Sequence, residues 1–388
     1  MTYETVKGFK DFTGEEAQKR EYIRAILVKN FQKYGFEPAE TPVVEYREFV
    51  KGDNQNDEAV SDIFKLEDRG KRELALRYEF TFQLKRLMMG KKMPYKRFSI
   101  GPVFRDEPVK GNRFRQFVQC DIDIIDSTAK DEAEILAVVK RVLSELKINF
   151  VIYINNRKLL NEILEKENIE KIDFEKVIKE IDKLDKLDRD EVYNNLRGLG
   201  AQNVLEIFEK PIDFFEKYDN YKEIKELIKY CKSYDVDVVF SPSLARGLSY
   251  YNGSVYEVKT KEMKETITAG GSFMFNSVQS TGISFGLDRL CMLAKDKENE
   301  GSVMVLSIGE NEKAIEISEK LRDLDMNVIV SYDKVSKALD YADSKKVSKV
   351  IFVGSDEVSK GKVKVRDMKT GSEKLVEINK IGEIINGI

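Results

Sequence analysis

The sequence predicts a protein of mixed α and β structure in two or three domains, with a helical segment inserted into the first domain. Three observations carry this prediction. Two apolar runs within 97–126 flank a polar, glycine-containing loop, which is the pattern of a β-hairpin. Residues 157–235 are rich in Lys, Glu and Ile and have helical periodicity nearly throughout. From residue 302 onward, strand and helix patterns alternate, as in a small α/β domain.

The composition excludes several classes of chemistry. Hydrophobic residues at 41% and charged residues at 35% indicate a soluble globular protein, and the net charge of −3 neither requires nor rules out a nucleic-acid partner. No apolar run is long enough to span a membrane and no signal peptide is recognisable, so a cytoplasmic location is expected. The three cysteines lie far apart, which argues against a disulfide framework or a zinc site. Histidine is absent, so histidine-based triads, metal ligands and general bases are excluded.

An amphipathic helix is predicted near the N-terminus. Thr13 and Glu16 have the spacing of a capping box, and Gly35 can end the helix. Apolar residues at helical spacing occupy 22–34. This face can pack inside its own domain or form a subunit interface, and the residues alone favour internal packing.

Residues 62–90 are predicted to form a hairpin that leads into a helix. The turn is expected at Asp68-Arg69-Gly70, and the helix is expected to start near Thr81. Glu79 and Thr81 therefore fall at a strand-to-helix junction, where polar side chains and free backbone donors converge. The alternative is that Thr81 is only the N-cap of the helix.

The hairpin at 97–126 carries an unusual set of charges. Arg105, Arg113 and Arg115 can face one ligand at its loop, and arginine suits multidentate binding of phosphate. Asp121 and Asp123 lie two residues apart on the returning strand and therefore point to one face. The arrangement fits a ligand with a phosphate beside an ammonium group. A surface hairpin with solvated charges is the plainer alternative.

Strand patterns return at 238–260, after the helical segment. Arg246 stands beside Gly247 there, and glycine lets the backbone approach a ligand closely. Tyr250 and Tyr251 offer hydroxyls and flat faces that can bind a small ring. Packing of both tyrosines in a core is equally compatible with the pattern.

Two further signals lie between 269 and 294. Residues 269–271 are Ala-Gly-Gly, a second signal for close approach of the backbone to a ligand. Asp288 and Arg289 lead a predicted helix, and an arginine in the first turn opposes the helix dipole. This placement is easier to explain if Arg289 faces an anion.

The C-terminal residues 302–388 are predicted to form a β-α-β-α-β unit with a mostly parallel sheet and two more short strands. They contain no G-x-G-x-x-G or G-x-x-x-x-G-K-[ST] loop, so nucleotide binding by this domain is not expected. An interaction or RNA-contacting role is favoured.

Together, these motifs resemble those of the histidyl-tRNA synthetases, a family of class IIa aminoacyl-tRNA synthetases. FRDEPVKGNRFRQFVQCDID resembles the second class-defining motif, GLDRL at 286–290 resembles the third, and the helix ending in GFEPAETP resembles the first, with Pro42 as its proline. LALRYEFT and LARGLSYYNGSVYE resemble the two stretches with which the family binds histidine. QCDID, which ends at Asp123, and DKLDKLDR at 182–189 are similar to the archaeal and eukaryotic branch.

The resemblance implies a fold and an activity. The fold would be an α+β catalytic domain with an antiparallel sheet (the class II synthetase fold) at 1–156 and 236–295, a helical insertion at 157–235, and an α/β anticodon-binding domain at 302–388. The activity would be that of an aminoacyl-tRNA ligase, which uses ATP and Mg²⁺ to convert L-histidine to histidyl-adenylate and then charges tRNA(His). A homodimer through the first-motif helix is also implied.

The resemblance further implies roles for single residues. The catalytic residues would be Arg105, Arg246 and Arg289. ATP would be bound by Arg105, Glu107, Arg113, Phe117 and Arg289. Histidine would be bound by Glu79, Phe80, Thr81, Arg105, Gln119, Asp123, Arg246, Tyr250 and Tyr251. No protein side chain is implied as a metal ligand.

Some positions depart from the family pattern. Ser249 stands where LARGLDYY has Asp, and Ser-Phe-Met at 272–274 follows Ala-Gly-Gly where Arg-Tyr-Asp is usual. Phe273 therefore replaces a tyrosine near the ring pocket. Asp126 replaces a small residue after the second motif. These changes concern the ring pocket and leave the phosphate-binding arginines in place.

Two other functions fit parts of the sequence. A paralogue without synthetase activity, such as the regulatory subunit of ATP phosphoribosyltransferase, resembles the catalytic core. Such proteins usually lack the C-terminal domain and the active-site arginines, which are present here. A dimeric RNA-binding or scaffold protein without catalysis is the third possibility.

Overall fold

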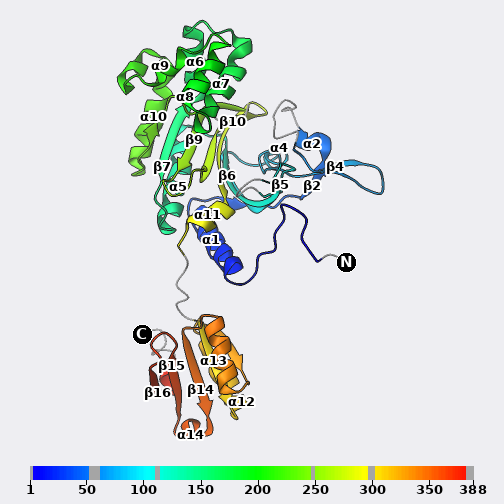
Figure 1. Cartoon of the computed structure of the whole chain (residues 1–388), viewed down its shortest axis with the longest axis vertical. Helices are drawn as coiled ribbons and strands as arrows, with labels where there is room; N and C mark the ends of the chain where they lie inside the picture. The colour runs from blue at the N-terminus through cyan, green and yellow to red at the C-terminus, as the bar shows by residue number, and fades with distance from the viewer. Residues whose placement is uncertain (1–2, 52–61, 110–113, 246–249, 296–301, 382–388) are drawn as a thin grey trace. The chain divides into compact units, whose positions relative to one another are not determined.

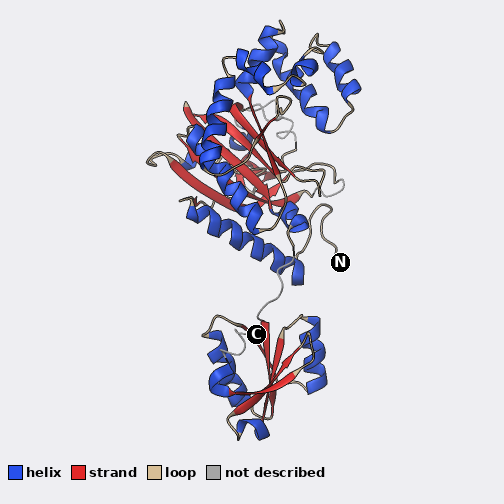
Figure 2. Ribbon diagram, turned by 90° about the vertical axis from the view of Figure 1, so that its left-hand side faces the viewer, coloured by secondary structure: helices blue, strands red, loops and turns tan. Residues whose placement is uncertain are grey.

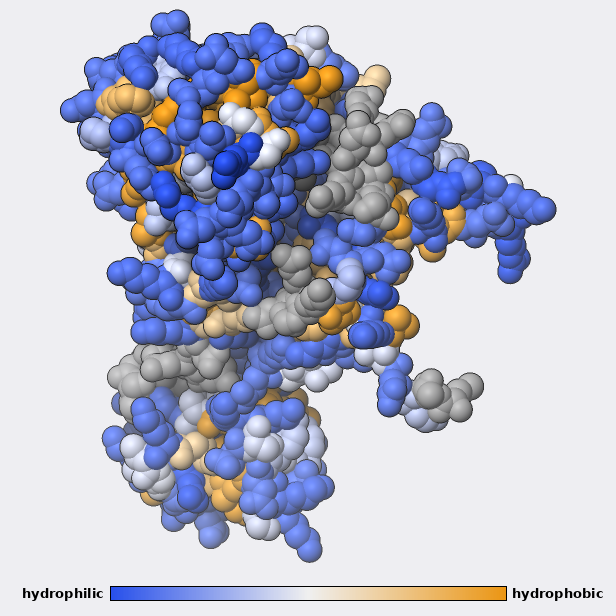
Figure 3. Space-filling view, turned by 45° about the horizontal axis from the view of Figure 1, so that its top comes forward, coloured by the Kyte–Doolittle hydropathy of each residue, from blue (hydrophilic) through white to orange (hydrophobic). Residues whose placement is uncertain are grey.

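The computed structural model describes residues 3–51, 62–109, 114–245, 250–295 and 302–381. Contacts divide the chain into two units, Met1–Lys295 and Asp296–Ile388, and each unit has its own sheet. Among the described residues, no helix has the length and apolar character needed to cross a membrane. Figure 3 shows a mostly hydrophilic face, as the high content of charged residues predicts.

The first unit is built on an eight-stranded sheet. In spatial order the strands are β1 (Glu37–Pro38), β5 (Tyr95–Phe104), β6 (Gln116–Ile125), β11 (Val278–Gly286), β10 (Thr268–Phe275), β9 (Tyr251–Lys259), β7 (Val151–Asn156) and β8 (Val239–Phe240). Neighbouring strands are antiparallel except for the two edge pairs, β1–β5 and β7–β8. The predicted hairpin is β5–β6, and the antiparallel sheet implied by the resemblance is confirmed.

Helices cover one face of this sheet. They are α1 (Gly14–Lys33), α5 (Ala129–Glu145) and α11 (Leu287–Leu293), and Figure 1 shows α1 and α11 together below the sheet. Alternation along β6 explains the arrangement, because Cys120, Ile122 and Ile124 are fully buried in the core that these helices share. The polar residues between them must point to the opposite face.

The start of α1 differs from the prediction. Thr13 is the N-cap but its side chain makes no capping hydrogen bond, so the expected capping box with Glu16 is wrong. Glu16 instead forms an ion pair with Lys10, 2.8 Å away. The predicted end is confirmed, since Gly35 has φ +77° and its N–H donates to the carbonyl of Gln32.

A small three-stranded sheet precedes the hairpin. Its order is β2 (Val44–Tyr46), β4 (Glu73–Leu76) and β3 (Lys65–Glu67), all antiparallel, with α2 (Arg47–Lys51) beside it. The predicted β3–β4 hairpin is confirmed. The next helix, α4 (Leu84–Leu87), begins later than predicted and has Gln83 at its N-cap. Thr81 is therefore not the cap of this helix.

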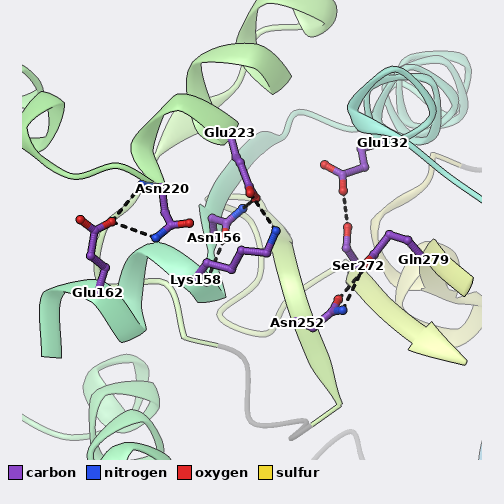
Figure 4. A network of polar contacts seen from close by, with 9 residues as sticks. All are labelled: Glu132, Asn156, Lys158, Glu162, Asn220, Glu223, Asn252, Ser272 and Gln279. Atoms are coloured by element: carbon purple, nitrogen blue, oxygen red, sulfur yellow. Dashed lines mark hydrogen bonds and ion pairs between the residues drawn. The ribbon is translucent and has the colours of Figure 1, made fainter. Parts of the chain in front are cut away.

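Residues 157–233 form helices and their connections. These are α6 (Arg157–Lys166), η1 (Lys171–Asp173), α7 (Phe174–Asp182), η2 (Lys183–Asp185), α8 (Arg189–Arg197), α9 (Val204–Phe208), η3 (Ile212–Lys217) and α10 (Tyr221–Ser233). Polar contacts attach this helical insertion to the end of β7. Glu223 of α10 accepts hydrogen bonds from Asn156 (2.9 Å) and Lys158 (2.8 Å), as Figure 4 shows. The insertion packs with the sheet in one unit.

The second unit has a five-stranded sheet in the order β13-β12-β14-β15-β16. Its elements are β12 (Ser302–Ile308), α12 (Asn311–Arg322), β13 (Asn327–Ser331), α13 (Val335–Ser344), β14 (Lys349–Gly354), α14 (Ser355–Val358), β15 (Lys362–Asp367), β16 (Glu373–Glu377) and η4 (Ile378–Lys380). The β-α-β-α-β core is parallel as predicted, and the two added strands pair antiparallel. Helices α12 and α13 pack on opposite faces of this sheet, in separate apolar clusters (Figure 2).

Candidate functional site

A cavity of about 650 Å³ opens on the face of the large sheet that carries Asp121 and Asp123. Its walls come from β6, β9, β10 and β11, from the segment before α4, from α11, and from the insertion. Most residues predicted for the site line it together: Glu79, Thr81, Arg105, Glu107, Phe117, Gln119, Asp123, Tyr250, Tyr251 and Arg289. Segments far apart in the sequence thus meet in one place.

Some predicted residues lie elsewhere. Phe80 is buried outside the cavity lining, with its ring 4.6 Å from the guanidinium of Arg77. Arg115 turns to the loop, where it donates to the carbonyl of Glu107 (3.1 Å) and pairs with Asp106 (3.3 Å), so it does not join Arg105 at one ligand. Arg113 and Arg246 lie outside the described residues.

Three buried acids, Glu79, Asp121 and Asp123, line the cavity. Burial raises the pKa of Glu79 to about 8, the pKa of Asp123 to about 7 and the pKa of Asp121 to about 6. Arg105 opposes this rise at Glu79, and Arg97 opposes it at both aspartates. One oxygen of Glu79 has no hydrogen-bond partner among the described residues. This group of acids suits a ligand that brings hydrogen-bond donors and a positive charge.

Arg97 is a functional neighbour that the sequence did not reveal. Its side chain is fully buried on β5, opposite Asp123 in the strand register, and the two groups pair at 2.6 Å. It also donates to the carbonyl of Phe80 (3.0 Å). Strand alternation from Asp123 across the hairpin could have found it, since Arg97 lies directly across the ladder.

Asp121 is held by a second set of cavity residues. Ser284 faces it across β6 and β11 and donates to its carboxylate (2.5 Å), while Gln119 donates to Ser284 (3.1 Å). The acceptor oxygen of the Gln119 amide has no partner among the described residues. Ser284 carries no motif of its own, so only the strand register identifies it.

Two arginines line the cavity as well. The guanidinium of Arg105 lies 5.2 Å from the ring centroid of Phe117. Arg289, in the first turn of α11, also lines the cavity. Its neighbour Asp288 turns to α1, where it pairs with Arg20 (2.6 Å), and it accepts from the backbone N–H of Val118 (3.1 Å). Asp288 therefore fixes the helix, and Arg289 is presented to the cavity.

The glycines of β10 and β11 serve strand packing. A Cβ on Gly270 would lie 2.0 Å from the carbonyl oxygen of Gly282. A Cβ on Gly282 would lie 2.0 Å from the Asp123 carboxylate. Gly270, which was predicted to allow close approach of a ligand, lines the cavity, and the backbone of the neighbouring strand also lies against it. Gly282 brings Asp123 close to β11.

Aromatic rings complete the cavity beside the acids. The rings of Tyr250 and Tyr251 are 4.8 Å apart, and Phe273 meets Tyr250 edge to face at 5.9 Å. Burial raises the pKa of Tyr250 well above its usual value, so its hydroxyl keeps its proton. The neighbouring Ser272 points to the helical side of the sheet, where it donates to Glu132 (Figure 4).

Family models match both units of the chain. A model described as histidyl-tRNA synthetase matches residues 8–290, and one described as anticodon binding domain matches residues 302–388. A curated histidine–tRNA ligase 1 from Bacillus cereus is 33% identical over 99% of this chain and 100% of its own length. A histidine–tRNA ligase from Wolinella succinogenes is 31% identical over 100% of this chain and 99% of its own length. These relatives are bacterial, so the archaeal and eukaryotic branch predicted from QCDID and DKLDKLDR is not supported.

Solved structures share the fold. The crystal structure of histidyl-tRNA synthetase from a Nostoc species has a TM-score of 0.88 at 24% identity, and covers 100% of this chain and 99% of that one. A Bacillus halodurans structure described as an ATP phosphoribosyltransferase regulatory subunit/histidyl-tRNA synthetase has a TM-score of 0.75 at 20% identity, over 87% of this chain and 96% of that one. The low identities mean that these structures compare folds alone.

Proposed function

The chain belongs to the histidyl-tRNA synthetase family, and we propose that it is a histidine–tRNA ligase acting through the cavity on the large sheet. It activates L-histidine with ATP and transfers the histidyl group to the 3′ end of tRNA(His). The observation that carries this proposal is one cavity that is lined both by Arg105 and Arg289 and by buried acids that include Glu79. A triphosphate and an α-ammonium group require these opposite charges.

The arginines of the cavity fit ATP, because guanidinium groups bind phosphate oxygens in a planar, multidentate manner. The family resemblance assigns Arg105 to the α-phosphate and Arg289 to the γ-phosphate. The Phe117 ring, with Arg105 above it, offers a face for adenine. Glu107 also lines the cavity, and the family resemblance adds Arg113 and Arg246 to the residues that would bind ATP. Mg²⁺, when bound with the nucleotide, supplies further positive charge to the phosphates.

The buried acids fit the amino group of histidine. Glu79, Gln119 and Asp123 line the cavity, and the oxygens of Glu79 and Gln119 that lack a hydrogen-bond partner among the described residues can accept hydrogen bonds from an ammonium group. A bound cation favours ionised carboxyl groups and so opposes the effect of burial on their pKa values. Thr81 lies beside them. Tyr250 and Tyr251 then line the space for the imidazole ring.

The chemistry needs no histidine in the protein. The substrate carboxylate is already a nucleophile, so its attack on the α-phosphate requires no general base. The charge that develops on the phosphoryl group is stabilised by arginines fixed in place before the reaction. Arg105 has such support, since it rests on Phe117 and donates to the carbonyl of Tyr78 (3.4 Å).

Partners follow from the two units. We assign tRNA(His) binding to both, with the C-terminal unit reaching the anticodon. A homodimer through α1, a cytoplasmic location, and the division into catalytic, insertion and anticodon-binding domains belong to the same proposal. The branch suggested by QCDID is not part of it.

Histidine-dependent exchange of pyrophosphate into ATP tests the function. With purified protein and Mg²⁺, exchange is expected with histidine and not with other amino acids, followed by charging of tRNA(His). Absence of exchange under these conditions would contradict the proposal. It would instead favour a regulatory subunit of ATP phosphoribosyltransferase, which the fold shared with the Bacillus halodurans protein keeps as the second candidate. Against that candidate stands the match of a complete anticodon binding domain.

A further inference from the structure

Polar contacts run without a break from the helical insertion to Arg289. The first pair joins Asp185 of η2 to Lys259 at the end of β9, with the ammonium nitrogen 2.8 Å from the carboxylate. The same ammonium group lies 3.1 Å from the carboxylate of Glu257. Lys259 therefore holds one carboxylate of the insertion and one of the sheet.

The contacts continue through the connection between β9 and β10. Glu257 accepts a short hydrogen bond from the hydroxyl of Thr266. The carbonyl of Thr266 accepts from a guanidinium nitrogen of Arg289. Thr266 thus uses its side chain to anchor itself and its backbone to hold the arginine. We call the whole chain of contacts the polar link, and it comprises Asp185, Lys259, Glu257, Thr266 and Arg289.

Because Glu257 is buried, it depends on these contacts. Glu257 is 2% exposed, and a carboxylate in such a place depends on its cation and its hydrogen-bond donors. Burial opposes the charge of Lys259, but the hydrogen bonds to Asp185 and Glu257 keep its pKa above the usual value. Loss of Lys259 would leave Glu257 without this charge partner, and its bond to Thr266 would change.

All members of the polar link line the cavity, so the insertion supplies part of the wall. We propose that the helical insertion positions Arg289 through the polar link, and that the state of the insertion therefore controls the affinity for ATP. The inference rests on the proposed role of Arg289 at the γ-phosphate. Lys259 and Glu257 are positioning residues in this scheme, because they act through Thr266 on the arginine.

Titration of the full-length protein with ATP and Mg²⁺ in a calorimeter tests the inference. Asp185→Asn and Lys259→Met are expected to raise the Kd for ATP about threefold to tenfold. Lys259→Arg keeps the charge and should stay close to wild type. The double variant should resemble Lys259→Met alone, because both changes break the same link. The KM for histidine in the exchange reaction should change less than the KM for ATP.

Asp213→Asn is the matched control. Asp213 is an exposed aspartate of the insertion on η3, outside the cavity lining, and the change removes the same charge. An unchanged Kd for ATP in both link variants would overturn the inference, as would an equal effect of Asp213→Asn. A wild-type protein that binds ATP without exchange would refute the proposed function and leave the link intact. A wild-type protein that does not bind ATP would overturn both.

Discussion

Glu79 is the cavity acid whose pKa departs most from its usual value. Burial raises its pKa to about 8, and the nearby Asp121 and Asp123 add to the rise, while Arg105 opposes it. An isolated carboxylate would be costly in this position. In the proposed function, the ammonium group of histidine supplies the missing charge, so substrate binding would offset the cost of burying Glu79.

Glu79→Gln should therefore weaken binding of histidine. A charge-assisted hydrogen bond is worth roughly 1.5–3 kcal/mol, so the KM for histidine in the exchange reaction should rise about 10-fold to 150-fold. The KM for ATP should change less, because Glu79 is proposed to bind the amino group of histidine and not the phosphates. Glu67→Gln, on the exposed strand β3, is the control. An equal rise in the KM values for histidine and ATP would contradict the role proposed for Glu79.

Glu132 shows buried charge outside the cavity. It lies in the first turn of α5, 9% exposed, with hydroxyl groups of Ser272, Ser254 and Tyr256 around it, and burial raises its pKa. A folded-state pKa above the unfolded value means that the folded protein holds its proton longer. The contribution of Glu132 to the free energy of unfolding must then fall as the pH rises above about 4.5, the usual value for glutamate.

Glu132→Gln should remove this pH dependence. At pH 8 the variant should be more stable than wild type, and the difference should shrink as the pH falls toward 4.5. Urea unfolding of both proteins across this range gives the comparison. A variant that is less stable at pH 8 would mean that the hydroxyl donors favour the ionised form enough to outweigh burial.

Single residues show what sequence reasoning can reach. Arg105, Glu79 and Arg289 were predictable because their motifs or positions imply a ligand. Arg97 was not, because a buried arginine is identified only by the carboxylate that faces it across the ladder. Phe80 lies between the cavity residues Glu79 and Thr81 in the sequence, but its ring lies against the guanidinium of Arg77 and not in the cavity.

At the scale of elements, β10 and β11 approach each other closely at Gly270. A Cβ at Gly270 would lie 2.0 Å from the carbonyl oxygen of Gly282 and 2.7 Å from the Cα of Ile283. These are backbone atoms, which cannot turn away as a flexible side chain can. The two strands carry Ser284 and Thr268 into the cavity wall, so their separation affects the site as well as the core.

Gly270→Ala should consequently lower the free energy of unfolding by about 2 kcal/mol or more, measured by urea denaturation. The exchange activity should fall with it, because β11 must shift away from β10. Gly70→Ala provides the comparison, since its Cβ would come no closer than 3.4 Å to a side-chain oxygen of Asp68. If both alanine variants unfolded at the same urea concentration as wild type, the close packing inferred for these strands would be wrong.

Elements with strong periodicity were predictable, but the N-terminal ends of two helices were not. The β5–β6 hairpin, the helical insertion and the C-terminal β-α-β-α-β unit follow from apolar spacing, which packing then enforces. The capping box at Thr13 fails because Glu16 has a competing partner in Lys10. The predicted start of helix α4 near Thr81 was wrong because no local sequence signal marks Gln83 as the N-cap. The eight-stranded order could not be deduced, since it depends on contacts between distant strands.

At the scale of the whole molecule, the two units have separate cores. The clusters around Ile122 and Phe273 belong to Met1–Lys295, and those around Val305 and Leu306 belong to Asp296–Ile388. All described residues of the cavity lie in the first unit. Activation of histidine and recognition of the tRNA anticodon can therefore be separated.

A chain that ends at Lys295 should fold and retain histidine-dependent exchange, because its cavity and core are complete. The KM values for ATP and histidine should stay within about twofold of the full chain. Charging of tRNA(His) should fall about 100-fold in kcat/KM, which corresponds to a loss of roughly 2.7 kcal/mol of binding free energy. Circular dichroism of the shortened chain checks its folding independently. A folded chain that lost exchange would show that the C-terminal unit supports the cavity. Undiminished charging would instead show that the first unit alone recognises the tRNA.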